Sequence, residues 1–177
     1  MLRNRFGIED QATLDRVERE WVVQRILEGC PKGRFDLAHL QAIHRHLFQD
    51  IFDWAGELRI VELSKEGDRF QPRAYIETGM ANVHARLVSR NFLKGLNGPE
   101  FAKAAAHIVG DVNYVHPFRE ENGRTQLQYL RQLAEQAGHP LDIAALQDSW
   151  IAASRASHKG DYGPMADAIL AAIGAAG

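Results

Sequence analysis

The sequence predicts an all-α domain with one short β-hairpin, and three observations lead to this fold class. Apolar residues recur at spacings of three and four along most of the chain, which is the period of an amphipathic helix. Only residues 56–72 break that period, with apolar residues on both sides of a polar turn. The 177 residues, 45% of them hydrophobic, suffice for one well-packed domain and are too few for two. We therefore expect a single compact domain over residues 1–177.

The first third of the chain predicts two helices. Before residue 30, charges of alternating sign are typical of a solvated helix face. The charged residues concerned are Asp15, Arg16, Glu18, Arg19 and Glu20. The next helix is expected after Asp36, which can cap its first turn, with Phe35 and Leu40 placed to pack across the cap. Its apolar face is formed by Leu37, Leu40, Ile43, Leu47 and Ile51.

Residues 57–72 predict the hairpin, which we term the flap. Leu58, Ile60, Val61 and Leu63 precede a polar stretch that contains Gly67-Asp68, and Arg69 to Pro72 follow it. Two short strands joined by a turn at Gly67-Asp68 fit this pattern, with the polar tip exposed.

The rest of the chain predicts helices again. Asn97-Gly98-Pro99 marks a start, because proline suits the first turn of a helix. The buried face that follows is Phe101, Ala105, Ile108, Val112 and Val115. Another helix is expected from Gly123 to Gly138, and two more begin at Asp142 and at Asp161, the last running to about Ile173.

Residues 116–124 read His-Pro-Phe-Arg-Glu-Glu-Asn-Gly-Arg and form a loop that leads into a helix. Such a loop binds anions readily, because unpaired backbone N–H groups and the helix dipole are positive there. Gly123 permits close approach of a ligand to the backbone. Arg124 offers a planar fork of donors for phosphate oxygens, and Asn122 adds an amide donor.

Two further residues of this loop indicate chemistry. His116 titrates near neutral pH and can take a proton from a hydroxyl. Glu120 is a hard oxygen ligand of the kind that Mg²⁺ uses when it bridges a protein to phosphates. Taken singly, each of these residues fits an ordinary turn or a solvated ion pair. Together within nine residues they indicate a phosphate site with a base.

This segment resembles the signature of Fic proteins, His-x-Phe-x-(Asp/Glu)-Gly-Asn-Gly-Arg-x-x-Arg. Residues 52–59, Phe-Asp-Trp-Ala-Gly-Glu-Leu-Arg, look like the stretch that leads into the Fic flap, and residues 64–70 resemble the flap itself. The resemblance covers about residues 20–160. It implies a Fic-type helical domain that transfers AMP from Mg-ATP to a Tyr, Thr or Ser hydroxyl of a target protein, similar to the FicT-like toxins of toxin–antitoxin pairs.

The resemblance also implies the role of each residue. His116 would deprotonate the target hydroxyl, Glu120 would hold Mg²⁺, and the phosphates would lie against Asn122, Gly123 and Arg124. The flap would pair with the target backbone as an added strand. The flap residues expected to do so are Leu63, Ser64, Lys65 and Phe70.

Two positions depart from the signature. Glu121 replaces its first glycine, and a carboxylate close to bound phosphates would repel them. If its side chain points inward, ATP binding should weaken, whereas an outward side chain would leave the loop intact at some cost in strain. Leu127 replaces its final arginine, and Arg131, one turn on, is a candidate substitute. Three explanations stay open: a weakened or inactive transferase, a transferase with another donor, or an engineered substitution at 121. Gly123 argues against the Doc-like branch, which phosphorylates its targets and carries lysine there.

Regulation and partners follow from what the chain contains. Fic proteins are commonly restrained by a helix bearing (Ser/Thr)-x-x-x-Glu-(Gly/Asn), which does not occur here. Inhibition would then come from a separate small antitoxin or be absent. The net charge of −2 predicts no attraction to nucleic acid or to a membrane surface, and we expect a cytoplasmic protein. Delivery into another cell would leave no mark in the sequence.

Alternatives of other classes remain at this stage. The chain can be a non-catalytic module that binds a nucleotide or a partner, or a transferase that uses UTP or CDP-choline. His39, His44 and His46 are spaced as ordinary surface or boundary histidines rather than as a metal site. Cys30, the single cysteine, is typical of a small buried hydrophobe.

Overall fold

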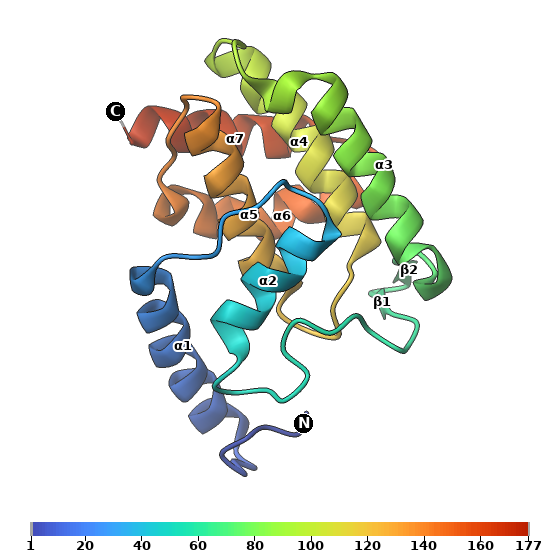
Figure 1. The fold of residues 1–177 in the computed structure, drawn as a ribbon, viewed down its shortest axis with the longest axis vertical. Helices are drawn as coiled ribbons and strands as arrows, with labels where there is room; N and C mark the ends of the chain where they lie inside the picture. Colours follow the sequence, from blue (N-terminus) through green and yellow to red (C-terminus); the bar gives the residue numbers. More distant parts are fainter. Residues whose placement is uncertain (1, 177) are drawn as a thin grey trace.

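Helix α4 (Gly98–Val115) is the centre of the fold. It packs against α3 (Ile76–Ser89), α5 (Asn122–Gln136), α6 (Gln147–His158) and α7 (Gly163–Ala175) in a computed structural model that describes residues 2–176 (Figure 1). The predicted start is confirmed, because the Asn97 side chain accepts from the Glu100 N–H in a capping box and proline occupies the first turn. The predicted apolar face is buried: Phe101, Ala105, Ile108, Val112 and Val115.

Helices α1 (Gln11–Glu28) and α2 (Leu37–Phe48) form the other part of the bundle. Asp36 caps α2 as predicted, since its carboxylate accepts from the His39 N–H. Helix α2 packs against α5, while α1 lies at the edge of the molecule beside α2 (Figure 1). The prediction of a solvated charged face on α1 is wrong at one position: Glu18 is only 6% exposed.

The flap is shorter than predicted. Strands β1 (Ser64–Lys65) and β2 (Asp68–Arg69) pair antiparallel around Glu66-Gly67, both with positive φ. The turn therefore lies one residue earlier than expected, since a two-residue hairpin turn needs this left-handed backbone at both positions. The strand expected over residues 58–63 is absent from the structure. Ile60 is 82% exposed, and the Arg59 N–H bonds instead to the carbonyl of Pro117.

The C-terminal part follows the predicted order with shifted starts. The helix expected from Asp142 begins as a 3-10 turn, Ile143–Leu146, before α6. The helix expected from Asp161 begins at Gly163. Two further 3-10 turns, Arg73–Tyr75 and Asn91–Leu93, flank α3. Within residues 2–176, no helix has both the length and the hydropathy that crossing a bilayer requires.

Candidate active site

The loop between α4 and α5 begins at His116, which ends α4 in the left-handed conformation (φ 49°, ψ 63°). Its far end is closed by Asn122, the first residue of α5. The Asn122 side-chain oxygen accepts from the Phe118 N–H at 3.0 Å, and its amide donates to the Phe118 carbonyl at 2.8 Å. Asn122 is 3% exposed, so its amide shapes the loop from inside.

The side chain of His44 in α2 joins the loop to Gly56 through hydrogen bonds of both ring nitrogens. Its Nδ1 accepts from the Gly56 N–H at 2.8 Å, and its Nε2 donates to the Glu120 carbonyl at 3.2 Å. The ring stacks on Phe118, with 4.0 Å between centroids. Burial lowers the pKa of His44 to about 4, so the ring is neutral at physiological pH.

The sequence-based interpretation of His44 as a surface or boundary histidine is therefore wrong. A signal for its burial was present, because His44 lies four residues after Leu40 and four before Phe48, which are both core residues of α2. His39 is also buried, with Nδ1 accepting from the Phe35 N–H. Both are structural histidines that hold backbone groups.

His116 presents one ring nitrogen for chemistry. Its Nδ1 donates to the Asn113 carbonyl at 3.1 Å, which leaves the lone pair of Nε2 free to accept a proton. Burial lowers the pKa of His116 to about 4, and the positive charges of Arg59 and Lys65 act in the same direction. The flap residue Phe70 covers the ring face to face at 3.7 Å.

A hollow of about 180 Å³ lies beside His116. The flap and α6 form its walls, with Phe70 and Lys65 on one side and Trp150 and Arg155 on the other. Glu66 at the flap tip pairs with Arg155 at 2.6 Å, which links the flap to α6 over this hollow. Gly123 lines the floor, and a Cβ placed on it meets no atom within 4 Å. The floor at the N-terminus of α5 is therefore open to a ligand.

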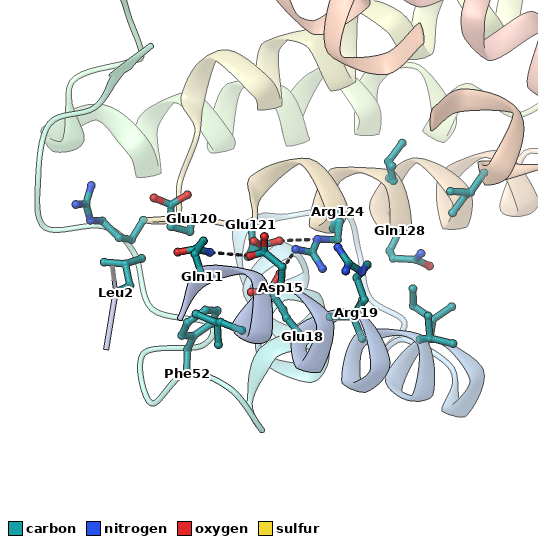
Figure 2. A pocket seen from close by; sticks show the side chains of 17 residues that line it. Leu2, Gln11, Asp15, Glu18, Arg19, Phe52, Glu120, Glu121, Arg124 and Gln128 are labelled. Atoms are coloured by element: carbon teal, nitrogen blue, oxygen red, sulfur yellow. Dashed lines mark hydrogen bonds and ion pairs between the residues drawn. The ribbon is translucent and has the colours of Figure 1, made fainter. Parts of the chain in front are cut away.

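A second hollow, of about 940 Å³, lies on the other side of the loop between α1 and α5 (Figure 2). Arg124 is its central cation, and Figure 2 shows it joined to two carboxylates. Its Nε is 2.7 Å from a carboxylate oxygen of Glu121, and its terminal nitrogen pairs with Glu18 from α1. The guanidinium also lies over the Phe48 ring at 5.5 Å.

Glu121 occupies the signature's glycine position in a left-handed backbone (φ 64°, ψ 21°). A residue with a side chain is strained in this conformation, and glycine is not. Burial and the nearby carboxylate of Glu18 raise the pKa of Glu121, while Arg124 opposes the shift. The Glu121 carboxylate is therefore directed at Arg124 rather than into solvent.

The structure divides the predicted site residues between the two hollows. His116 and Gly123 line the smaller one, whereas Glu120, Glu121 and Arg124 line the larger one. The loop itself is the wall between them. A ligand that contacts both His116 and Arg124 must therefore lie across the N-terminus of α5.

Glu120 is suited to be the one protein ligand of a Mg²⁺ ion. Its side chain is exposed in the larger hollow and, within residues 2–176, forms no ion pair. The same part of the chain holds no cluster of three or more His, Cys, Asp or Glu side chains able to bind a metal alone. One carboxylate completed by phosphate oxygens and water is a normal arrangement for Mg²⁺, and Glu120 fits it.

The two remaining sequence expectations concern α5 and the flap. Leu127 is partly buried against the core and lines the larger hollow. Arg131 pairs with Glu135 at 2.9 Å and lines neither of the two hollows. In the flap, Ser64 and Lys65 are exposed, whereas Leu63 and Phe70 are partly buried and joined by a backbone hydrogen bond of 3.1 Å.

Comparison with known proteins gives a consistent set of relatives. Residues 34–134 match the model of the Fic/DOC family. The probable protein adenylyltransferase y4lH of Sinorhizobium fredii is 40% identical over 168 residues, which cover 94% of this chain and 88% of that protein. The probable protein adenylyltransferase Fic of Escherichia coli is 35% identical over 164 residues, covering 91% of this chain and 82% of that one.

Solved structures agree with these relatives. The BepC protein of Bartonella tribocorum, a VirB-translocated effector crystallised with bound AMPPNP, superposes with a TM-score of 0.85. It is 28% identical in sequence, and the superposition covers 97% of this chain and 91% of that chain.

Proposed function

Since this chain belongs to the Fic/DOC family, we propose that it is a protein adenylyltransferase in which His116 takes the proton from a hydroxyl of the target protein. The observation that carries the proposal is the hydrogen bond from His116 Nδ1 to the Asn113 carbonyl. That bond fixes the tautomer in which Nε2 is an acceptor. The lowered pKa of His116 keeps the ring neutral and ready to accept at physiological pH.

The reaction needs few groups from the protein. The hydroxyl oxygen attacks the α-phosphorus of ATP, the bond between the α-phosphorus and the bridging oxygen breaks, and pyrophosphate leaves while Nε2 keeps the proton. Arg124 and the backbone N–H groups at the start of α5 would bind the phosphates across Gly123. Glu120 would hold Mg²⁺, which would neutralise charge on the phosphates when bound.

The flap would bring in the target. Within the described residues, β1 pairs only with β2, so the outer edge of Ser64-Lys65 can accept an extended target segment as a third strand. Phe70 stacks on one face of the His116 ring, which leaves the Nε2 lone pair in the plane of the ring available to a hydroxyl. The segment that would bind the target therefore also holds the base in place.

The larger hollow is the place where a small antitoxin would act. It is an open groove beside Arg124, and a helix laid along α1 and α5 would reach the phosphate end of the site. Use of ATP as the donor supports a reaction in the cytoplasm, either of the cell that makes the protein or of one into which it is delivered.

One observation favours a second candidate function. Arg124 is paired with two carboxylates, which weakens its attraction for phosphates, and Leu127 supplies no replacement cation. A protein with this site can bind a nucleotide or a partner without transferring AMP. A donor other than ATP is a further variant of the same idea.

The test is incubation with α-³²P-labelled ATP, Mg²⁺ and a bacterial lysate, beside a His116→Ala control. If the native protein labels a lysate protein and the His116→Ala control does not, the result supports AMP transfer with His116 as the base. Equal labelling by the His116→Ala protein would overturn the role of His116. Absence of label from ATP, with label from UTP or CDP-choline, would replace the donor, and absence from all three would favour the binding module.

A further inference from the structure

Arg59 is a buried arginine at the point where the flap leaves the core. It is 4% exposed, and its side chain is entirely covered. Such a cation is costly to bury unless its donors are bonded. Its only acidic neighbour among the described residues is Glu62, 3.6 Å away and itself 62% exposed. An ion pair therefore does not explain why this arginine is buried.

Backbone carbonyls take the donors of Arg59 instead. Its Nε donates to the carbonyl of His116 at 2.7 Å, and one terminal nitrogen donates to that of Val61 at 2.8 Å. The other terminal nitrogen donates to the carbonyls of Gln71 and of Val115. The Arg59 backbone N–H adds a bond of 2.9 Å to Pro117.

These bonds complete the C-terminus of α4. The last carbonyls of a helix have no partner within the helix and must find one elsewhere. Here the carbonyl of Asn113 accepts from the His116 ring, and the carbonyl of Tyr114 accepts from the Gln71 N–H at 3.0 Å. The carbonyls of Val115 and His116 both accept from the Arg59 side chain. A cation at this end of a helix also interacts favourably with the helix dipole.

The conformation of His116 requires such support. It is left-handed at φ 49°, and a proline follows it, which further restricts the backbone of the preceding residue. A non-glycine residue remains in such a conformation only when its surroundings hold it. The bond from Arg59 Nε to the His116 carbonyl acts directly on this peptide group.

Arg59 also joins the base to the flap. Val61 lies before β1 and Gln71 after β2, and the carbonyls of both residues accept from the same guanidinium. The planar fork of an arginine fixes the directions of these bonds, which a lysine ammonium cannot do. The two ends of the flap and the backbone of His116 are therefore held in one arrangement.

We infer that Arg59 is a positioning residue for AMP transfer, which holds His116 in its left-handed conformation and keeps the flap in register with it. This role rests on the proposed function of His116 as the base. In this role Arg59 does not contact the substrate and acts through the backbone of His116.

The test compares Arg59→Met and Arg59→Lys with the native protein in the labelling assay, with ATP varied at a fixed amount of lysate. For Arg59→Met we expect the rate at saturating ATP to fall roughly 100-fold, because the base is misplaced, while the KM for ATP changes by less than about threefold. Arg59→Lys keeps the charge and one donor nitrogen, so we expect its rate at saturating ATP to be roughly tenfold higher than that of Arg59→Met.

The second measurement follows the imidazole resonances of His116 by NMR as the pH is varied. In the native protein the groups facing the ring are Asn113, Phe70, Arg59, Lys65 and His158. If Arg59→Met releases the ring toward solvent, the pKa of His116 rises from about 4 toward 6.5. A native-like titration together with a native rate in both variants would overturn the inference.

Arg25→Met is the matched control. Arg25 is a structural arginine that donates to both oxygens of Asp50 at 2.7 and 2.8 Å, with no contact to residues 114–117. We expect this variant to lose stability without moving the titration of His116. If Arg59→Met does not fold, Arg59→Lys carries both measurements. If His116→Ala still labels targets, the proposed base is wrong, while the titration still decides whether Arg59 positions the ring.

Discussion

The Arg124 guanidinium is paired with the carboxylate of Glu18, which lies 106 residues earlier in the chain on α1. Glu18 is buried, and it faces the same cation as Glu121 (Figure 2). Two carboxylates thus compete with phosphates for the only arginine of the signature that this chain retains. The pair is a specific reason to expect weak ATP binding, since phosphates must displace Glu18 or share Arg124 with it.

Glu18→Gln should therefore strengthen ATP binding. The substitution removes one negative charge beside Arg124 and keeps the size of the side chain, so we expect the Kd for Mg-ATP to fall by about tenfold. Isothermal titration calorimetry measures this directly. Glu20→Gln is the control, because it removes the same charge from an exposed position of the same helix. An equal effect of the two substitutions would show that net charge, and not the pair, controls affinity.

Replacement of Glu121 separates charge from backbone strain. Glu121→Gly and Glu121→Ala both remove the carboxylate beside Arg124, so both should bind ATP more tightly than the native protein. Only glycine also relieves the left-handed backbone at φ 64°. We expect the free energy of unfolding of the glycine variant to exceed that of the alanine variant by at least about 1 kcal/mol. Denaturation in urea measures the difference, and equal stabilities would mean that position 121 is not strained.

Much of the fold was predictable because it depends on local signals. The caps Asn97 and Asp36 and the apolar spacing within α2 and α4 are read from neighbouring residues, and each helix forms where these signals place it. The strand expected over residues 58–63 failed for a nonlocal reason. That segment has no neighbouring strand. It is held instead by the bonds of the Arg59 backbone N–H and side chain to the carbonyls of Pro117 and His116.

The residues of the candidate site were predictable, but their arrangement was not. The loop 116–124 carries its own signature, so His116 and Arg124 stand out in the sequence. Glu18 does not, because it acts on Arg124 from a distant helix and its residue type fits a solvated face equally well. The spacing of His44 from Leu40 and Phe48 indicates burial, but only the packing of α2 against the loop shows its bond to the Glu120 carbonyl.

Phe70→Ala should uncover the base. Phe70 stacks on His116 at 3.7 Å and excludes water from one face of the ring. Without it, the cost of charging the ring falls, so we expect the pKa of His116 to rise from about 4 toward 6.5. NMR titration of the imidazole resonances measures this shift. Ile60→Ala, at an exposed position before β1, is the control and should leave the titration as it is.

His44 should make the fold sensitive to acid. Its folded-state pKa of about 4 lies below the ordinary value of 6.5, so the unfolded chain binds more protons between these values. Stability from the neutral ring is present above pH 6.5 and is lost as the pH falls toward 4. The cause is specific, since protonation of Nδ1 removes the acceptor for the Gly56 N–H.

His44→Gln removes this titration and leaves the carboxylates unchanged. Between about pH 7 and about pH 4 we expect the native protein to lose about 3 kcal/mol more unfolding free energy than the variant. Urea denaturation across this range gives both curves, and their difference cancels the shared titration of Asp and Glu. Parallel curves would mean that His44 takes up its proton over the same pH range in the folded and unfolded states, so that a neutral ring is not what holds Gly56 and the loop at Glu120 together.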